Sequence, residues 1–265
     1  MALGADYDFG ATPGLMEDGF EFYSPQGALR AKEALDAFPG GRALAVLGNM
    51  FKCPGAHNET ALMLNDYLTK IGFAGRVVDP PHQPAPMPIP ISKKTSDGIA
   101  GVLAEAGIQH WPSSRVVRLH LETHIARLED GRTLPYDLLL GIPVHCAPPV
   151  VASSDLVDNG WIAVELPTFD TKFPGVYVVG DVTVRRCRVQ AGSPKERRRP
   201  LLPSSSPASG GDEPPPPYDG PAFCYVELGT RGVARIDVNF LSYDMPVAKF
   251  SAPNTQKALD KNRRL

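Results

Sequence analysis

The dipeptide Gly180-Asp181 and the cysteine Cys53 are the two features of this sequence whose residue types and surroundings could do chemistry. Residues 176–179 form an apolar run that predicts a buried strand, and Gly180-Asp181 follows at its carboxyl end. Ligands of open parallel sheets collect at that end of the strands, where glycine lets them approach the backbone closely. A carboxylate beside the glycine can accept hydrogen bonds from ribose or ribityl hydroxyls. The pair therefore predicts a cofactor contact, and an aspartate that caps the following turn is the equally weighted alternative.

Cys53 stands in the tripeptide Lys52-Cys53-Pro54, between an apolar run and a helix whose periodic face begins near Ala61. A neighbouring cation and a helix amino terminus both favour the thiolate form of a cysteine. A thiolate is a nucleophile suited to attacking sulfur or to forming an adduct with a flavin. A lone cysteine is more often a small buried hydrophobe, so the residues alone leave both roles open.

The elements that would position Cys53 are a strand, a helix and a second strand. Residues 43–47 are continuously apolar, residues 76–78 form a weaker run, and the helix between them is indicated by Ala61, Leu64, Leu68 and Ile71 with Gly72 as its stop. This order predicts a parallel pair joined by a crossover, the kernel of a nucleotide-binding α/β domain. The turn after residue 47 lacks the GxGxxG glycines, which disfavours a nicotinamide dinucleotide there.

The remaining periodic segments are short strands and one more helix. Residues 99–106 have helical spacing, and residues 116–121, 124–128 and 132–134 alternate around the Asp130-Gly131 turn, which predicts a β-meander. Further strands are expected at residues 136–144 and 161–164. Residues 224–228 and 234–240 predict a small antiparallel layer near the carboxyl end.

Composition excludes several classes of function. There are 27 basic and 29 acidic residues, a net charge of −2, so no global field draws the chain to nucleic acid. The four cysteines and six histidines show no metal-ligand spacing, so no metal is expected. No apolar run approaches the roughly 18 residues that a membrane span requires. The cysteines fit reduced thiols in a cytoplasmic protein.

Several motifs, in this order, resemble the sulfide:quinone oxidoreductases and flavocytochrome c sulfide dehydrogenases, within the pyridine-nucleotide-disulfide oxidoreductase superfamily. The resemblance covers most of the chain. Its motifs are Leu3-Gly4-Ala5 with Pro13-Gly14-Leu15, Phe51-Lys52-Cys53-Pro54-Gly55-Ala56 with Glu59, Tyr136-Asp137-Leu138-Leu139, Phe173-Pro174-Gly175-Val176-Tyr177 up to Gly180-Asp181, and Cys224-Tyr225-Val226-Glu227.

The resemblance implies an FAD-dependent oxidoreductase in which Cys53 is the first redox cysteine. It implies that the cofactor FAD is contacted by Gly4, Ala5, Gly180, Asp181 and Val182. Electrons would pass from sulfide or a related small donor to a quinone or cytochrome partner. The expected location is the cytoplasm, and the family leaves open a peripheral contact with the inner face of the cell membrane and a homo-oligomer.

The sequence departs from the family pattern at three places. Val182 and Thr183 stand where sulfide oxidisers usually carry their second redox cysteine. The opening strand-GxGxxG-helix unit of the family is missing, because Met1 falls at the later crossover motif, and about half of the flavin contacts would go with it. Residues 185–217 have no periodicity and are rich in Arg, Pro, Ser and Gly, which predicts disorder or a pair of compensating frameshifts.

The expected fold is therefore α/β: an incomplete flavoprotein with two Rossmann-like dinucleotide-binding domains, a β-meander and a small carboxyl-terminal antiparallel layer. The expected segments are 1–39 (crossover remnant of the FAD domain), 40–115 (nucleotide-binding-like βαβ domain), 116–184 (β-meander and second half of the FAD domain), 185–217 (disordered or frameshifted) and 218–265 (β layer). Two other functions stay open. One is a type II NADH dehydrogenase-like flavoprotein, and the other is a non-catalytic remnant or a subunit that needs a separate amino-terminal FAD-binding chain.

Overall fold

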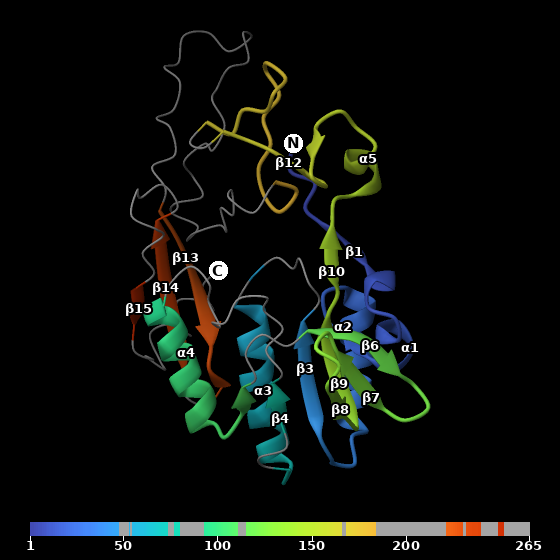
Figure 1. The fold of residues 1–265 in the computed structure, drawn as a ribbon. Coiled ribbons are helices and arrows are strands. Elements are labelled where there is room, and N and C mark those ends of the chain that lie inside the picture. Colours follow the sequence, from blue (N-terminus) through green and yellow to red (C-terminus); the bar gives the residue numbers. More distant parts are fainter. Residues whose placement is uncertain are drawn as a thin grey trace.

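A five-stranded parallel sheet forms the centre of the part of the chain that the structure describes (Figure 1). The structure is a computed structural model that describes residues 1–47, 53, 55–73, 77–79, 93–110, 115–165, 168–183, 221–229, 232–239 and 249–251. The strand order is β2-β9-β3-β4-β5, with bounds β2 Phe20–Glu21, β9 Leu138–Ile142, β3 Ala43–Leu47, β4 Val77–Asp79 and β5 Gln109–His110. The predicted parallel pair joined by a helix is confirmed, since β3 pairs in parallel with β4 and α3 (Ala56–Lys70) connects them.

Both faces of this sheet are covered, which explains the continuous apolar runs of its central strands. Alternate residues of a strand point to opposite faces. Ala43, Ala45, Leu138 and Leu140 belong to the core shared with the helices, whereas Leu44 and Leu139 belong to the core shared with the β-meander. The helices are α2 (Pro25–Asp36), α3 and α4 (Lys93–Glu105). None of the described helices is long and apolar enough to cross a membrane.

The ends of these helices follow from local sequence. Ser24 precedes α2, and its hydroxyl accepts the Gly27 N–H at 2.9 Å, while Pro25 occupies the first turn. Helix α3 ends before Gly72, whose φ of 94° is the left-handed conformation expected of a carboxyl-terminal stop. Ile71, predicted on the buried face of this helix, instead lies just past its last residue and is 41% exposed.

The predicted β-meander is confirmed as an antiparallel three-stranded sheet of β6 (Val116–His120), β7 (Ile125–Leu128) and β8 (Thr133–Pro135). It is fastened to the short helix α1 (Leu15–Asp18) through Asp18. One oxygen of that carboxylate accepts the Tyr136 hydroxyl at 2.5 Å and contacts His124 Nδ1 at 2.9 Å. Burial and this hydrogen bond hold the pKa of Tyr136 far above its ordinary value, so the hydroxyl stays protonated and donates.

Asp18→Ala is expected to destabilise the protein by about 1–2 kcal/mol, because it leaves the buried Tyr136 hydroxyl without its acceptor. The midpoint of urea unfolding measures this loss. The exposed neighbour Glu17 is the matched control, and Glu17→Ala should shift the midpoint much less. Equal shifts for the two variants would contradict the assignment of Asp18 as the link between α1 and the meander.

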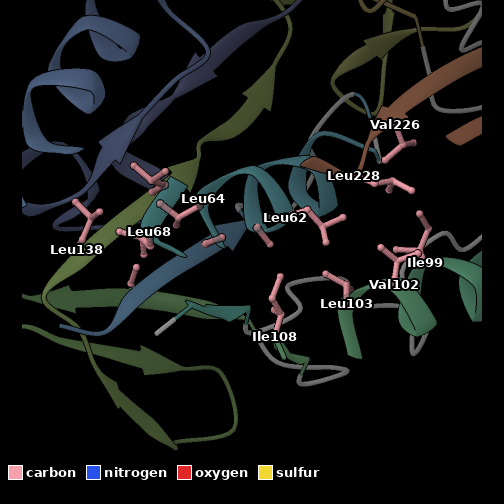
Figure 2. Packing of buried hydrophobic residues seen from close by; sticks show 14 of the residues in the cluster. Leu62, Leu64, Leu68, Ile99, Val102, Leu103, Ile108, Leu138, Val226 and Leu228 are labelled. Atoms are coloured by element: carbon pink, nitrogen blue, oxygen red, sulfur yellow. The ribbon is translucent and has the colours of Figure 1, made fainter. Parts of the chain in front are cut away.

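A second antiparallel sheet lies on the outer side of the helices. It contains β13 (Pro221–Glu227), β14 (Val233–Asn239) and β15 (Lys249–Ser251), so the predicted carboxyl-terminal layer is confirmed, with one strand more than expected. Val226 and Leu228 join the same buried cluster as Leu62 of α3 and Ile99 of α4 (Figure 2). Helix α3 therefore has the parallel sheet on one side and this layer on the other (Figure 1).

A third group of residues lies beyond the carboxyl ends of the parallel strands (Figure 1). The chain leaves β9 and enters β10 (Val144–Cys146), which pairs antiparallel with β1 (Asp6–Asp8). The group also holds α5 (Pro149–Ala152), β11 (Val157–Asp158) and β12 (Trp161–Ile162). The strand expected at residues 161–164 is thus present but shorter.

The prediction of a strand at residues 176–179 is wrong. Val178 is fully buried as expected, but Tyr177 makes only an isolated bridge to Asp170, and no ladder forms at this segment of the described chain. The Val178 N–H donates to the Phe169 carbonyl at 3.1 Å, and the Val179 N–H donates to the Met1 carbonyl at 3.0 Å. Carbonyl groups outside any strand therefore accept the backbone hydrogen bonds of a segment whose side chains are typical of a strand.

The parallel sheet extends across the expected segment boundaries. Strand β2 and helix α2 fall within the segment 1–39, and β9 falls within 116–184, yet both strands belong to the same sheet as β3. The proposed division into domains stays a prediction. Residues 184–220, which include the segment 185–217, lie outside the described residues.

Candidate functional site

The amino terminus lies against the Gly180 segment, which brings five predicted cofactor-binding residues into one region. The Met1 ammonium group donates to the Tyr177 carbonyl at 2.7 Å, and the Val179 N–H donates to the Met1 carbonyl at 3.0 Å. Ala5 packs against the buried cluster that contains Val178 and Val182. Residues 176 positions apart in the sequence are thereby adjacent in space.

Two glycines of this region leave open space beside their backbones. Gly4 has a φ of 68° and Gly180 a φ of 87°, and a Cβ added to either would meet no atom within 4 Å. The Thr183 hydroxyl donates to the Gly180 carbonyl at 2.8 Å and closes the turn, while the Asp181 side chain is exposed. The residues fit the polar chain of a flavin, because open backbone and an exposed carboxylate can approach ribityl hydroxyls.

Val182 is placed differently from the other four. Its side chain is fully buried in the cluster with Ile162 and Trp161, and its carbonyl accepts the Ile162 N–H at 3.1 Å. A contact between Val182 and a ligand could therefore come only from its backbone N–H. Its predicted role stays a prediction.

An aromatic cluster that the sequence did not predict lies between this region and the sheet. Tyr7 of β1 and Tyr23 both meet the ring of His145 edge-on, with centroids 5.0 Å away in each case. His145 is buried, and its Nδ1 lies 3.0 Å from the Pro143 carbonyl, which can only accept, so Nδ1 carries the proton. The cluster packs β10 against β1 and against Tyr23, which follows β2. Its signal, Tyr7 opposite His145 in the β1–β10 pair, appears only once the pairing is known.

Tyr7 connects this cluster electrostatically with the predicted cofactor region. The pKa of Tyr7 is raised, first by burial and then by the negative charges of Glu21, Asp181 and Asp6. The Asp181 carboxylate therefore lies near enough to Tyr7 for its charge to be felt. The neutral phenol is the form that persists at physiological pH.

Cys53 lies between the carboxyl end of β3 and the first turn of α3. It is half-buried and adopts a φ of 61°, a conformation that non-glycine residues rarely take. Its carbonyl accepts the Ala56 N–H at 3.1 Å. The predicted neighbours Lys52 and Pro54 lie outside the described residues, so the expected thiol and cation pair stays a prediction.

The two predicted parts of the site both follow the carboxyl-terminal ends of strands of the parallel sheet. Cys53 follows the carboxyl end of β3, and β3 runs parallel to β9, which leads through β10 to the amino terminus and β12 (Figure 1). The carboxyl ends of parallel strands are where such folds bind their ligands. That Cys53 and Asp181 face one isoalloxazine ring stays a prediction.

Glu59, a member of the motif that contains Cys53, is largely buried beside the carboxyl-terminal layer. Its carboxylate accepts the backbone N–H of Glu227 at 2.7 Å. Burial raises the pKa of Glu59 to about 7, the hydrogen bond opposes that rise, and the charge of Glu227 adds to it. Glu59 therefore titrates near neutral pH.

Comparison with known proteins shows the fold. No family model matches the chain, and no curated protein matches it significantly. The sulfide:quinone oxidoreductase of the hyperthermophilic bacterium Aquifex aeolicus superposes with a TM-score of 0.68 at 18% identity, over 99% of this chain and 66% of that one. A ferredoxin reductase from Rhodopseudomonas palustris superposes with a TM-score of 0.61 at 19% identity, over 90% of this chain and 56% of that one.

The NDH2 of Plasmodium falciparum, solved in complex with NADH, is a further neighbour, with a TM-score of 0.51 at 14% identity over 69% of this chain and 43% of that one. The chain thus spans less than two thirds of the length of these neighbours. They are Rossmann-like flavoprotein oxidoreductases, and the α/β fold predicted from the sequence is confirmed.

Proposed function

We propose that this chain is part of an FAD-dependent oxidoreductase that passes electrons from sulfide or a related small donor to a quinone or cytochrome. The observation that supports this most is the contact between Met1 and Tyr177, which brings the amino-terminal segment that holds Gly4 to the segment that leads to Gly180, within a fold shared with oxidoreductases. We propose a cytoplasmic location, with the acceptor reached at the inner face of the cell membrane.

In this proposal the described residues divide the work between holding FAD and handling the donor. The backbones of Gly4, Ala5 and Gly180 would hold the ribityl and isoalloxazine end of FAD, and the exposed Asp181 carboxylate would accept its hydroxyls. Bound FAD would supply the two-electron redox chemistry. Cys53 would be the nucleophile that attacks the donor, and it lies in the turn that follows the carboxyl-terminal end of β3.

NADH is the less favoured donor. In a dinucleotide-binding unit the pyrophosphate sits at the amino terminus of the helix that follows the first strand. Here Gly55 at the start of α3 faces Val226, with 3.5 Å between an added Cβ and the valine Cγ2. Glu59 and Glu227 add two carboxyl groups near that turn, which disfavours a phosphate.

The visible spectrum of the purified chain tests the proposal. We expect the absorption bands of oxidised flavin, bleached anaerobically by sulfide and restored by a soluble quinone. Bleaching by NADH but not by sulfide would favour a type II NADH dehydrogenase-like protein. A colourless protein that takes up no added FAD would contradict the proposal and favour a non-catalytic remnant or a subunit that needs a separate chain.

Gly180→Ala is expected to weaken FAD binding by about tenfold or more. The φ of 87° costs a non-glycine residue roughly 1–2 kcal/mol and so favours a shift of the turn, and the new methyl group would project into the open space that the proposal assigns to the flavin. Gly175 is a matched control, because it has a φ of 78° and the same open surroundings but lies outside the proposed contact. A flavin fluorescence titration compares the two. Equal losses in Gly175→Ala and Gly180→Ala would assign the effect to the backbone rather than to the flavin.

A further inference from the structure

The end of β13 and the residues just after it pack along one face of α3. Gly55, Glu59, Leu62 and Asp66 have the spacing of a single helical stripe. Gly55 meets Val226, and a Cβ added to Gly229 would lie 2.1 Å from the Asp66 carboxylate, so the layer approaches closely at both ends of the stripe.

Between these two ends the contact is apolar. Leu62 and Leu228 are both fully buried members of one cluster, and Figure 2 shows them on facing elements. Because the layer comes close to α3 at both ends of the stripe and packs against it in the middle, the layer and the stripe form a continuous interface.

Glu59 provides the polar contact of this interface. The Glu227 N–H that it accepts belongs to the last residue of β13, 168 positions away in sequence. A buried backbone N–H needs a partner, and loss of this acceptor leaves it unsatisfied. The side chain thus ties the end of the layer to the first turn of α3.

The same turn carries the Cys53 backbone. The Cys53 carbonyl accepts from Ala56, the first residue of α3, and the Cys53 φ of 61° is disfavoured for any residue with a side chain. Such a conformation persists only where the surrounding structure holds it. If the first turn of α3 separates from β13, the restraint on Cys53 is weakened.

We propose that Glu59 is a positioning residue for Cys53: through the Glu227 N–H it fastens the carboxyl-terminal layer to α3 and so holds the turn that presents the thiol. The contact rests on geometry alone, whereas the chemical use of the thiol rests on the proposed function. Among the described residues, the charged group that faces Glu59 across the interface is Glu227, and Asp66 lies two turns further along the same helix. The carboxylate oxygen of Glu59 holds the layer by accepting the Glu227 N–H, and its negative charge is not needed for this contact.

Alkylation of Cys53 by iodoacetamide, followed by mass spectrometry of the Cys53 peptide in the full chain, tests this without any measurement of activity. Glu59→Ala should raise the Cys53 alkylation rate about tenfold, because it removes the acceptor. Glu59→Gln keeps an accepting oxygen and should stay within about twofold of the unsubstituted protein. Glu105→Gln, at an exposed carboxyl of α4, is the control.

Cys146, a half-buried thiol on β10, reports in the same experiment on whether the whole protein has loosened. An unchanged Cys53 rate in Glu59→Ala, or a Cys146 rate that rises equally, would overturn the proposal. A Glu59→Gln rate as high as that of Glu59→Ala would also overturn it, since charge rather than the acceptor would then hold the turn. FAD content measured on the same samples tests the proposed function separately, because alkylation needs no flavin.

Discussion

Cys53→Ser is expected to lower sulfide-dependent quinone reduction by at least ~100-fold while the FAD content of the protein stays unchanged. A serine hydroxyl at this position stays protonated and is a far weaker nucleophile toward sulfur than a thiolate. The half-buried side chain is close to isosteric with serine, so the turn before α3 should keep its conformation. Steady-state kinetics with a soluble quinone, together with the flavin spectrum, measures both quantities.

Cys146→Ser is the matched control for this substitution. Burial raises the pKa of the Cys146 thiol, and the charges of Asp6 and Asp8 on the paired strand raise it further, so it is a poor nucleophile. The control should retain most of the activity. Similar losses in the two variants, or a Cys53→Ser protein that keeps its rate, would remove Cys53 from the reaction.

Glu59→Gln is expected to stabilise the protein by about 2–3 kcal/mol at pH 8 and to have little effect at pH 4. The pKa of Glu59 is about 7 in the folded protein against 4.5 for an ordinary glutamate. Below pH 4.5 the carboxyl is neutral in both states, so nothing distinguishes it from glutamine. As pH rises from 4.5 to about 7, the unfolded chain releases the Glu59 proton first. The folded protein therefore loses stability until the carboxyl is charged in both states.

Urea unfolding at several pH values between 4 and 8 measures this difference. The free energies of unfolding of the unsubstituted and Glu59→Gln proteins should diverge as pH rises and become parallel above pH 7 to 8. Glu105→Gln, at an exposed carboxyl, should show no such divergence. Parallel curves for the unsubstituted protein and Glu59→Gln over the whole range would mean that the Glu59 carboxyl is not buried in solution.

The strand and helix pattern could be predicted wherever burial repeats with a clear period. The β3–α3–β4 unit, the meander and the β13–β14 pair were all predicted from such runs. The place of β9 could not be predicted, since the apolar residues 136–144 indicate a strand without saying which strands flank it. Helix α2 was missed although Ser24 and Pro25 are ordinary start signals, because its buried residues, Gly27 and Ala31, are small and give only a weak apolar period.

Residues 176–179 show why composition alone misled. An apolar run predicts burial, and Val178 is buried, but a strand also requires a neighbouring backbone in register. Met1 and Phe169 supply the hydrogen bonds instead, from irregular segments. The burial of Val178 was predictable, whereas one of the two backbone partners of this segment, Met1, lies more than 170 positions away in the sequence.

The candidate site also contains features that the sequence predicted and features that depend on tertiary contacts. The resemblance brought Gly4 and Ala5 together with Gly180 and Asp181, and the structure makes these segments adjacent. The Tyr7–His145–Tyr23 cluster has no sequence signal, because its members come from three separate segments whose contact depends on the β1–β10 register. Glu59 stood in the motif, yet its elevated pKa arises first from burial and then from the charge of Glu227, which comes 168 residues later.

The place of β9 between β2 and β3 constrains how the protein assembles during synthesis. Phe20 pairs with Leu140 and Ala43 pairs with Leu138, so neither β2 nor the β2-facing edge of β3 has its neighbour until residue 142 has left the ribosome. At ~5–20 residues per second, the nascent chain carries these open edges for roughly five seconds or more. Loop closure over such separations is slow, and insertion of one strand then joins both edges in a single late event. Chaperone binding during that interval would protect the strand edges that β9 later covers.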